Sequence, residues 1–181
     1  LNDWSARDIQ KWEYQPLGPF NAKNFASTIS PWIVTIDALA PFRQPGPARL
    51  EGDPAVLEYL LPMADDVFDI NCCVSISSEK MRNEHVASLQ LTKSSLTNLT
   101  WSFAQMVAHH TSTGCPMKSG DLIGSGTISG ETKDSRGCLL ELTWRGTEPF
   151  DVPDGTQRRF LLDGDELTIK AWCESDGAPR I

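Results

Sequence analysis

Residues 67–77, VFDINCCVSIS, alternate apolar and polar side chains from Phe68 to Ser77. A period of two predicts a β-strand with one buried face. The run at 167–173 repeats this pattern after a turn at 163–165, and further strands are expected at 32–36, 121–124 and 138–144. The strand at 138–144 would carry Glu141 on the face opposite Leu140, Leu142 and the other apolar side chains.

Turn residues separate these short apolar runs. The chain has 13 glycines and 12 prolines, a distribution that favours many strands and turns over a helical bundle. Two segments nevertheless show helical spacing: residues 5–14, where Ser5 and Asp8 resemble a helix cap, and residues 95–110. The sequence therefore predicts a mostly β fold with a few helices (α+β), and an exposed loop at 41–54.

Length and composition exclude several classes of protein. A chain of 181 residues suits one domain. The net charge of −8, with the basic residues scattered, argues against a nucleic-acid partner. No run of eighteen apolar residues is present, and Asp3, Asp8 and Glu13 interrupt the start, so neither a membrane span nor an export signal is expected.

The five cysteines contain no C-x-x-C pair, which fits buried thiols in a reducing compartment such as the cytoplasm. The sequence begins with Leu1 inside a dense polar motif. We therefore expect residues 1–181 to be one partial domain of a longer protein.

That polar motif places four functional groups at helical spacing. Asp3, Arg7, Gln10 and Tyr14 lie at offsets of four, seven and eleven, which keeps them within one stripe of a 3.6-residue helix. The stripe would direct a carboxylate, a guanidinium, an amide and a phenol to one point. The alternative is a solvated face with an Asp3–Arg7 ion pair of a few tenths of a kcal/mol.

The next loop carries Lys23 among aromatic residues. A partly desolvated ammonium there could stabilise a developing oxyanion, although a solvated lysine explains the loop equally simply. Ser27 and Thr28 add hydroxyl oxygens suited to a hard divalent cation.

Two features of the second half are open to more than one interpretation. The loop SGTISG at 125–130 could bind an anion, although it lacks the lysine of a phosphate loop. Glu141 lies among leucines, where a buried carboxylate could orient a histidine base, or it is an exposed residue of an edge strand. His109 and His110 are expected to be structural residues near a helix end.

Together these segments resemble the fumarylacetoacetate hydrolase family in collinear order. The resemblance rests on NDWSARDIQ at 2–10, PLGPF at 16–20, Lys23, SPWIV at 30–34, SGTISG at 125–130, LEL at 140–142 and FLLDGDE at 160–166. The QKWEY continuation at 10–14 and the SGTISG loop point to the branch of the family that acts in tyrosine and phenylalanine catabolism.

The resemblance implies a rolled, mixed β-sheet catalytic domain of a homodimer. It also implies hydrolysis of a carbon–carbon bond in a 1,3-diketo acid, 4-fumarylacetoacetate, to fumarate and acetoacetate, with Ca²⁺ or Mg²⁺ as cofactor. The residues that match catalytic positions are Arg7, Gln10, Lys23 and Glu141, those that match substrate contacts are Gln10, Tyr14 and Thr127, and those that match cation sites are Asp3, Lys23 and Ser27.

The resemblance places the catalytic histidine and three further metal carboxylates upstream of Leu1. Ser27 stands where a threonine is usual in the family. Asp3 alone would bind a cation weakly, since such an ion prefers six or more oxygens, so residues 1–181 alone should be inactive. Two alternatives remain: another enzyme of the family, such as an acylpyruvate hydrolase or a keto-diacid decarboxylase, and a non-enzymatic β-rich assembly module.

Overall fold

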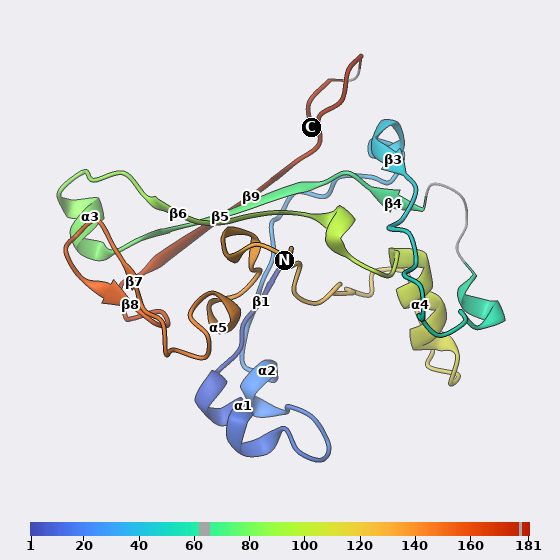
Figure 1. The fold of residues 1–181 in the computed structure, drawn as a ribbon, viewed down its shortest axis with the longest axis horizontal. Coiled ribbons are helices and arrows are strands. Elements are labelled where there is room, and N and C mark those ends of the chain that lie inside the picture. Colours follow the sequence, from blue (N-terminus) through green and yellow to red (C-terminus); the bar gives the residue numbers. More distant parts are fainter. Residues whose placement is uncertain (62–65, 178) are drawn as a thin grey trace.

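The computed structural model describes residues 1–61, 66–177 and 179–181. Its largest sheet has three strands, β5 (Asn71–Ser77), β6 (Leu89–Ser95) and β9 (Glu166–Trp172), in the order β6-β5-β9. Both pairings are antiparallel. This sheet runs across the whole molecule (Figure 1), and it confirms the strands predicted from the alternation at 67–77 and 167–173.

Three small antiparallel sheets surround it, each of two strands. They pair β1 (Asn2–Asp3) with β2 (Ser27–Thr28), β3 (Arg43–Gln44) with β4 (Val67–Phe68), and β7 (Phe150–Asp151) with β8 (Gln157–Arg158). The 67–77 run is therefore divided between β4 and β5, and β3 lies inside the predicted 41–54 loop. The α+β class is confirmed, with several small sheets.

The helices are short. They are α1 (Arg7–Glu13), α2 (Asn21–Asn24), α3 (Glu79–Asn83), α4 (Phe103–Thr111) and α5 (Leu139–Leu142), with single 3₁₀ turns at Ala40–Phe42, Glu58–Leu60, Leu96–Asn98 and Lys133–Ser135. Among the described residues no helix has the length and apolar character needed to cross a bilayer.

The predicted helix at 95–110 is interrupted. A 3₁₀ turn forms at Leu96–Asn98, and α4 begins only at Phe103. Ser102 ends the intervening segment because its hydroxyl accepts the Gln105 N–H while the Gln105 side chain accepts the Ser102 N–H. This reciprocal capping fixes the start of the helix after the predicted position.

The strand predicted at 138–144 is wrong, because these residues form α5. The Leu142 N–H donates to the Cys138 carbonyl and the Thr143 N–H to that of Leu139. Trp144 and Arg145 then take positive φ angles of 45° and 57°, which ends the helix. Leu and Glu favour a helix, and one turn of helix buries Leu142 against the sheet.

The strands predicted at 32–36 and 121–124 are also absent from the described structure. Both segments have the apolar residues of a strand, but neither finds a neighbouring strand in the described part of the chain. Trp32 and Ile33 remain 85% and 89% exposed. Sequence pattern alone cannot supply the hydrogen-bonded partner that a strand requires.

The core lies between the large sheet and α5. Ile76, Leu91 and Leu142 form its centre, and it is extended by Leu89, Leu139, Phe150, Leu161 and Leu167. In Figure 1, α5 lies below the sheet, and the α1–α2 pair projects further down. The first residues of the chain, the sheet and α5 therefore meet in one region.

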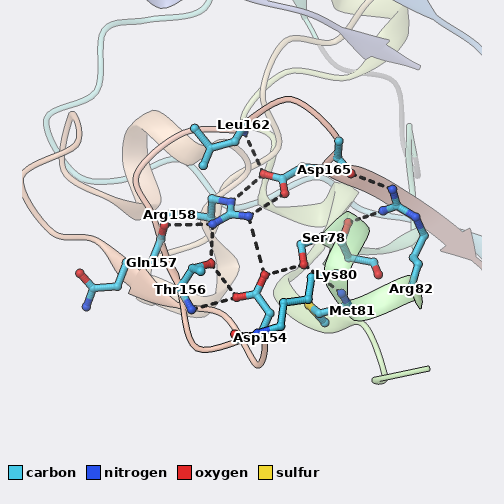
Figure 2. Close-up of polar contacts among 12 residues, drawn as sticks. Ser78, Lys80, Met81, Arg82, Asp154, Thr156, Gln157, Arg158, Leu162 and Asp165 are labelled. Carbon is cyan, nitrogen blue, oxygen red and sulfur yellow. Dashed lines mark hydrogen bonds and ion pairs between the residues drawn. The ribbon is translucent and has the colours of Figure 1, made fainter. Parts of the chain in front are cut away.

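A buried polar network joins β8 to α3 (Figure 2). The Arg158 guanidinium donates to both Asp165 oxygens, at 2.8 and 3.0 Å, and lies 3.9 Å from Asp154. Asp154 in turn accepts from the Ser78 hydroxyl at 2.5 Å and from Thr156. Ser78 caps α3, so the network ties α3 to the 154–165 segment, although Ser78 and Asp154 are 76 residues apart in the sequence.

These contacts hold both carboxylates in the charged form. Hydrogen bonds from Ser78 and Thr156 lower the pKa of Asp154 to about 2. Burial by itself would raise the pKa of Asp165, but the bonds from Arg158 and the Leu162 N–H outweigh it and the pKa is lowered.

All five cysteines are free. Cys173 is buried and Cys72, Cys73 and Cys138 are half-buried, but Cys115 is exposed, so the expectation of buried thiols is wrong for this residue. Cys115 follows α4, in a segment too polar to be covered, and its sulfur lies 3.2 Å from His110 Nε2.

Candidate functional site

A cavity of about 420 Å³ opens between the start of the chain, the large sheet and α5. Its polar wall comes from the N-terminal segment and consists of Asn2, Asp3, Ser5, Arg7 and Asp8. Its apolar wall includes Val74, Leu91, Leu140, Leu142, Phe160, Leu167 and Ile169. An apolar pocket with a few convergent polar groups is typical of a small-molecule site.

Asp3 lies in β1 and not in the predicted helical stripe. Its cross-strand partner is Ser27, whose hydroxyl donates to Asp3 Oδ1 at 3.0 Å. Lys23 Nζ lies 3.2 Å from Asp3 Oδ2 and 3.2 Å from the Asp3 carbonyl oxygen. The structure therefore brings Asp3, Lys23 and Ser27 into contact, and the β1–β2 pairing places Ser27 beside Asp3.

Glu13 positions the helix that carries Lys23. Its Oε1 accepts the N–H groups of Phe20 and Ala22, both at 2.7 Å, and so satisfies donors at the start of α2. The Ala6 N–H donates to the Ala22 carbonyl at 2.9 Å and joins the two helices. Sequence reasoning missed Glu13, because an acidic residue at the end of a helix usually contacts only solvent.

The start of α1 differs from the prediction. Ala6, not Ser5, is the N-cap residue, and it makes no side-chain cap. The helix is oriented by the Ala6–Ala22 hydrogen bond, which no local pattern announces. Ser5 instead lines the cavity.

Arg7 and Gln10 act as a pair on α1. Arg7 Nη1 donates to Gln10 Oε1 at 2.6 Å, and Arg7 reaches the wall of the cavity beside Asp3. Tyr14 follows the helix, is 45% exposed and is not among the cavity-lining residues. The structure therefore places Arg7 in the cavity wall and Gln10 next to it through this hydrogen bond, and it leaves Tyr14 outside.

Glu141 lies beside the cavity, on α5. Its Oε2 accepts from the Ser129 hydroxyl at 2.6 Å and from the Cys138 thiol at 3.4 Å. Burial raises the pKa of Cys138, which keeps this thiol protonated and able to donate. Cys138 lines the cavity, and the Glu141 carboxylate contacts its thiol from behind the cavity wall. Glu141 is therefore not an exposed residue of an edge strand.

The SGTISG loop packs against the segment that precedes α5. A Cβ atom at Gly137 would lie 2.5 Å from the Ile128 carbonyl oxygen and 2.6 Å from Thr127 Cγ2, closer than real Cβ atoms approach. Thr127 is therefore held next to Gly137, a residue of the cavity wall. Sequence reasoning missed Ser129 and Cys138, although the glycines at 130 and 137 gave a signal of close backbone approach.

The histidines lie elsewhere. His109 Nδ1 is 3.1 Å from the Tyr59 hydroxyl, and His110 pairs with Cys115. Neither these residues nor His85 is among the residues that line the cavity. This agrees with the expectation that His109 and His110 are structural.

Comparison with known proteins decides the family. A family model described as the C-terminal part of fumarylacetoacetate (FAA) hydrolase matches residues 1–178. The chain belongs to the fumarylacetoacetate hydrolase family. In this structure Asp3 and Arg7 line the cavity, with Lys23 in contact with Asp3 and Gln10 in contact with Arg7.

Similar proteins from distant organisms carry the name fumarylacetoacetase. The one from Dictyostelium discoideum is 49% identical over 179 residues, that from Homo sapiens 47% over 177 and that from Arabidopsis thaliana 49% over 177. Each alignment covers 98% of this chain but only 40%, 41% and 40% of the respective relative. The chain thus spans about 40% of the length of the curated relatives it matches.

The described residues do not form a complete divalent-cation site. No cluster of three or more His, Cys, Asp and Glu side chains suited to a metal occurs among residues 1–61, 66–177 and 179–181. Asp3 and Ser27 offer oxygens, but a hard cation needs six or more. The Lys23 ammonium has no acceptor atom and competes with a cation for Asp3.

Proposed function

We propose that the full-length protein hydrolyses a carbon–carbon bond of 4-fumarylacetoacetate, giving fumarate and acetoacetate in tyrosine and phenylalanine breakdown. The proposal is carried by the collinear identity of 47–49% with fumarylacetoacetases over 98% of the chain. The cavity supports it, because the Asp3 and Asp8 carboxylates and the Arg7 guanidinium lie at the edge of an apolar pocket and the Lys23 ammonium contacts Asp3.

The reaction needs stabilisation of negative charge at two stages. Water adds to the carbonyl carbon next to the scissile bond, and the resulting oxyanion collapses, expels acetoacetate as a carbanion and leaves fumarate. A proton then adds to that carbanion. Lys23 and Arg7 supply positive charge, and Gln10, which accepts from Arg7 at 2.6 Å, keeps a side-chain N–H₂ donor for the substrate.

Glu141 would orient the base that activates the water. A carboxylate that binds an imidazole N–H fixes the tautomer and the direction of the other nitrogen. The histidine would come from a part of the longer protein outside residues 1–181, since His109 and His110 are engaged with Tyr59 and Cys115. Residues 1–181 alone are accordingly expected to be inactive. Thr127 and Tyr14 would contact the substrate.

We further propose that Asp3 contributes one carboxylate to a Ca²⁺ or Mg²⁺ site whose other ligands lie outside this chain. A bound cation would polarise the diketo oxygens of the substrate. Calorimetry of the full-length protein with each ion tests this, with Asp3→Asn as the variant and Asp134→Asn, on an exposed turn, as the control. Equal affinity for the cations in both variants would contradict the role of Asp3.

We also propose that the enzyme is a cytoplasmic homodimer. The free cysteines fit a reducing compartment. Light scattering on the purified full-length protein measures the mass in solution, and fractionation of cells measures location.

The decisive assay uses the full-length protein with fumarylacetoacetate and, separately, with acylpyruvates. We expect kcat/KM to be highest for fumarylacetoacetate, with fumarate and acetoacetate in equal amounts. Turnover of acylpyruvates alone would assign the chain to another enzyme of the family, and no turnover of either would favour an assembly module.

A further inference from the structure

We infer that Ser129 is a positioning residue that holds the Glu141 carboxylate in the orientation needed by the catalytic base. This inference rests on the proposed function and extends it to a residue outside the set of substrate and cation contacts. Hydrogen bonds and close packing around α5 support it.

Ser129 is the middle of a directed chain of hydrogen bonds. The Gly137 N–H donates to Ser129 Oγ at 3.0 Å, and the Ser129 hydroxyl donates to Glu141 Oε2 at 2.6 Å. Because the Ser129 oxygen accepts the Gly137 N–H, the hydroxyl proton points away from Gly137 and toward the Glu141 carboxylate. Hydrogen bonds arranged in series also strengthen one another.

The backbone around Ser129 is held on both sides. The Gly130 N–H donates to the Ser135 carbonyl at 2.9 Å, and a Cβ at Gly130 would lie 2.5 Å from Ser135 Oγ. At Gly137 the Ile128 carbonyl is equally close. Two glycines thus allow the 127–130 loop to pack directly on the 135–138 segment, so Ser129 has little freedom to move away from Glu141.

Only one oxygen of the carboxylate is used by these contacts. Both Ser129 and Cys138 donate to Oε2, whereas Oε1 receives no hydrogen bond from any described residue. The thiol is the weaker donor, and its distance to the oxygen is 3.4 Å. Ser129 therefore fixes the rotation of the carboxylate and leaves Oε1 for an imidazole N–H.

The test compares Ser129→Ala with Ser129→Thr in the full-length enzyme. Removal of the hydroxyl should lower kcat about 10- to 100-fold, the range typical when an outer partner of a site residue is removed, and leave KM within about 2-fold. Threonine keeps the donor and should restore most of kcat. Ser112→Ala is the matched control, because that exposed hydroxyl donates to the His109 carbonyl at the end of α4 and Ser112 does not line the cavity, and its kcat should stay within about 2-fold.

A double variant separates positioning from general damage. If Ser129 acts through Glu141, Ser129→Ala should cause no further loss of kcat in a Glu141→Gln background. Additive losses, an equal loss in Ser112→Ala, or a Ser129→Ala enzyme with unchanged kcat would each overturn the inference.

A structural measurement keeps this inference separable from the proposed function. If the wild-type protein turns over acylpyruvates instead, the same variants are assayed on those substrates. If it has no activity, crystal structures of the wild-type and Ser129→Ala proteins still decide the matter, because the Glu141 carboxylate should rotate when Ser129 Oγ is removed. A Glu141 carboxylate in the same orientation would overturn the role of Ser129 whatever the substrate.

Discussion

Two carboxylate–cation pairs in this chain have similar chemistry and different surroundings. In the Asp3–Lys23 pair the side chains are 51% and 31% exposed, and in the Arg158–Asp165 pair they are 7% and 1% exposed. Exposed pairs contribute about 0–1 kcal/mol to stability, whereas breaking a buried pair leaves a charge that water cannot reach. The first pair can therefore exchange its partner for a ligand, and the second cannot.

The neighbours of each pair support this distinction. Arg158 also donates to Thr156 and to the Gln157 carbonyl, so its donors are directed into the protein. The Asp3 carboxylate accepts a hydrogen bond from Ser27 on β2 and pairs with Lys23 on α2. Asp3 also lines the cavity. Exposure and cavity access, and not the presence of an ion pair, separate the candidate site from the structural network.

Breaking the buried pair should have the largest effect on stability. Arg158→Met should lower the free energy of unfolding by about 3–5 kcal/mol, because Asp165 remains buried without its partner. Denaturant unfolding of the full-length protein measures this. Arg158→Met combined with Asp165→Leu should recover part of the loss, and a single variant that loses less than about 1 kcal/mol would contradict the structural role.

Breaking the exposed pair should change stability little and catalysis strongly. Lys23→Ala should change stability by less than about 1 kcal/mol but lower kcat about 100- to 1000-fold with little change in KM, as expected for a contact to a developing oxyanion. Lys133→Ala is the matched control, since Lys133 forms an exposed pair with Glu148 at 2.7 Å and neither residue lines the cavity. Equal losses in kcat and KM would count against the oxyanion role.

The part of the fold that was predictable depends on local pattern. β5 and β9 alternate for seven residues each, long enough for period two to be distinctive. α5 was mistaken for a strand because Cys138, Leu140, Leu142 and Trp144 alternate too, although the four helical residues also present Leu139 and Leu142 to the core. The strand predicted at 32–36 is absent from the described structure for another reason, because a strand needs a hydrogen-bonded partner that the local sequence does not specify.

The candidate site shows the same division. The resemblance named Asp3, Lys23 and Ser27 as candidate cation-site residues, and the structure places them in contact. Helical spacing instead grouped Asp3 with Tyr14, which does not line the cavity. The pairing of β1 with β2 is a contact across 24 residues, which no local period reveals. The sequence did not reveal Glu13, which accepts two backbone N–H groups, or Ser129, which donates to a carboxylate. These partners are brought close only in the folded chain.

Acid should weaken the buried network. The pKa of Asp154 is about 2, below its ordinary value of 3.8, and that of Asp165 is also lowered. Groups with lowered pKa values stabilise the fold above pH 3.8, and this contribution is lost as pH falls toward about 2. Unfolding measured from pH 5 to pH 2 should show this loss. Asp154→Asn should flatten the curve, and Asp134→Asn should not.

The smallest change in kcat is expected for Glu13, which supports the Asp3–Lys23 pair indirectly by holding α2. Glu13→Gln keeps one acceptor but loses the charge that strengthens the bonds to Phe20 and Ala22, so stability should fall by about 1 kcal/mol. Because those bonds place α2, kcat should fall a few-fold, far less than in Lys23→Ala. Glu148→Gln is the control, since the Glu148 carboxylate accepts from the Lys133 side chain and from no backbone N–H of the described residues. A Glu13→Gln enzyme as impaired as Lys23→Ala would mean that the catalytic contribution of this region comes from the position of α2 and not from the Lys23 charge.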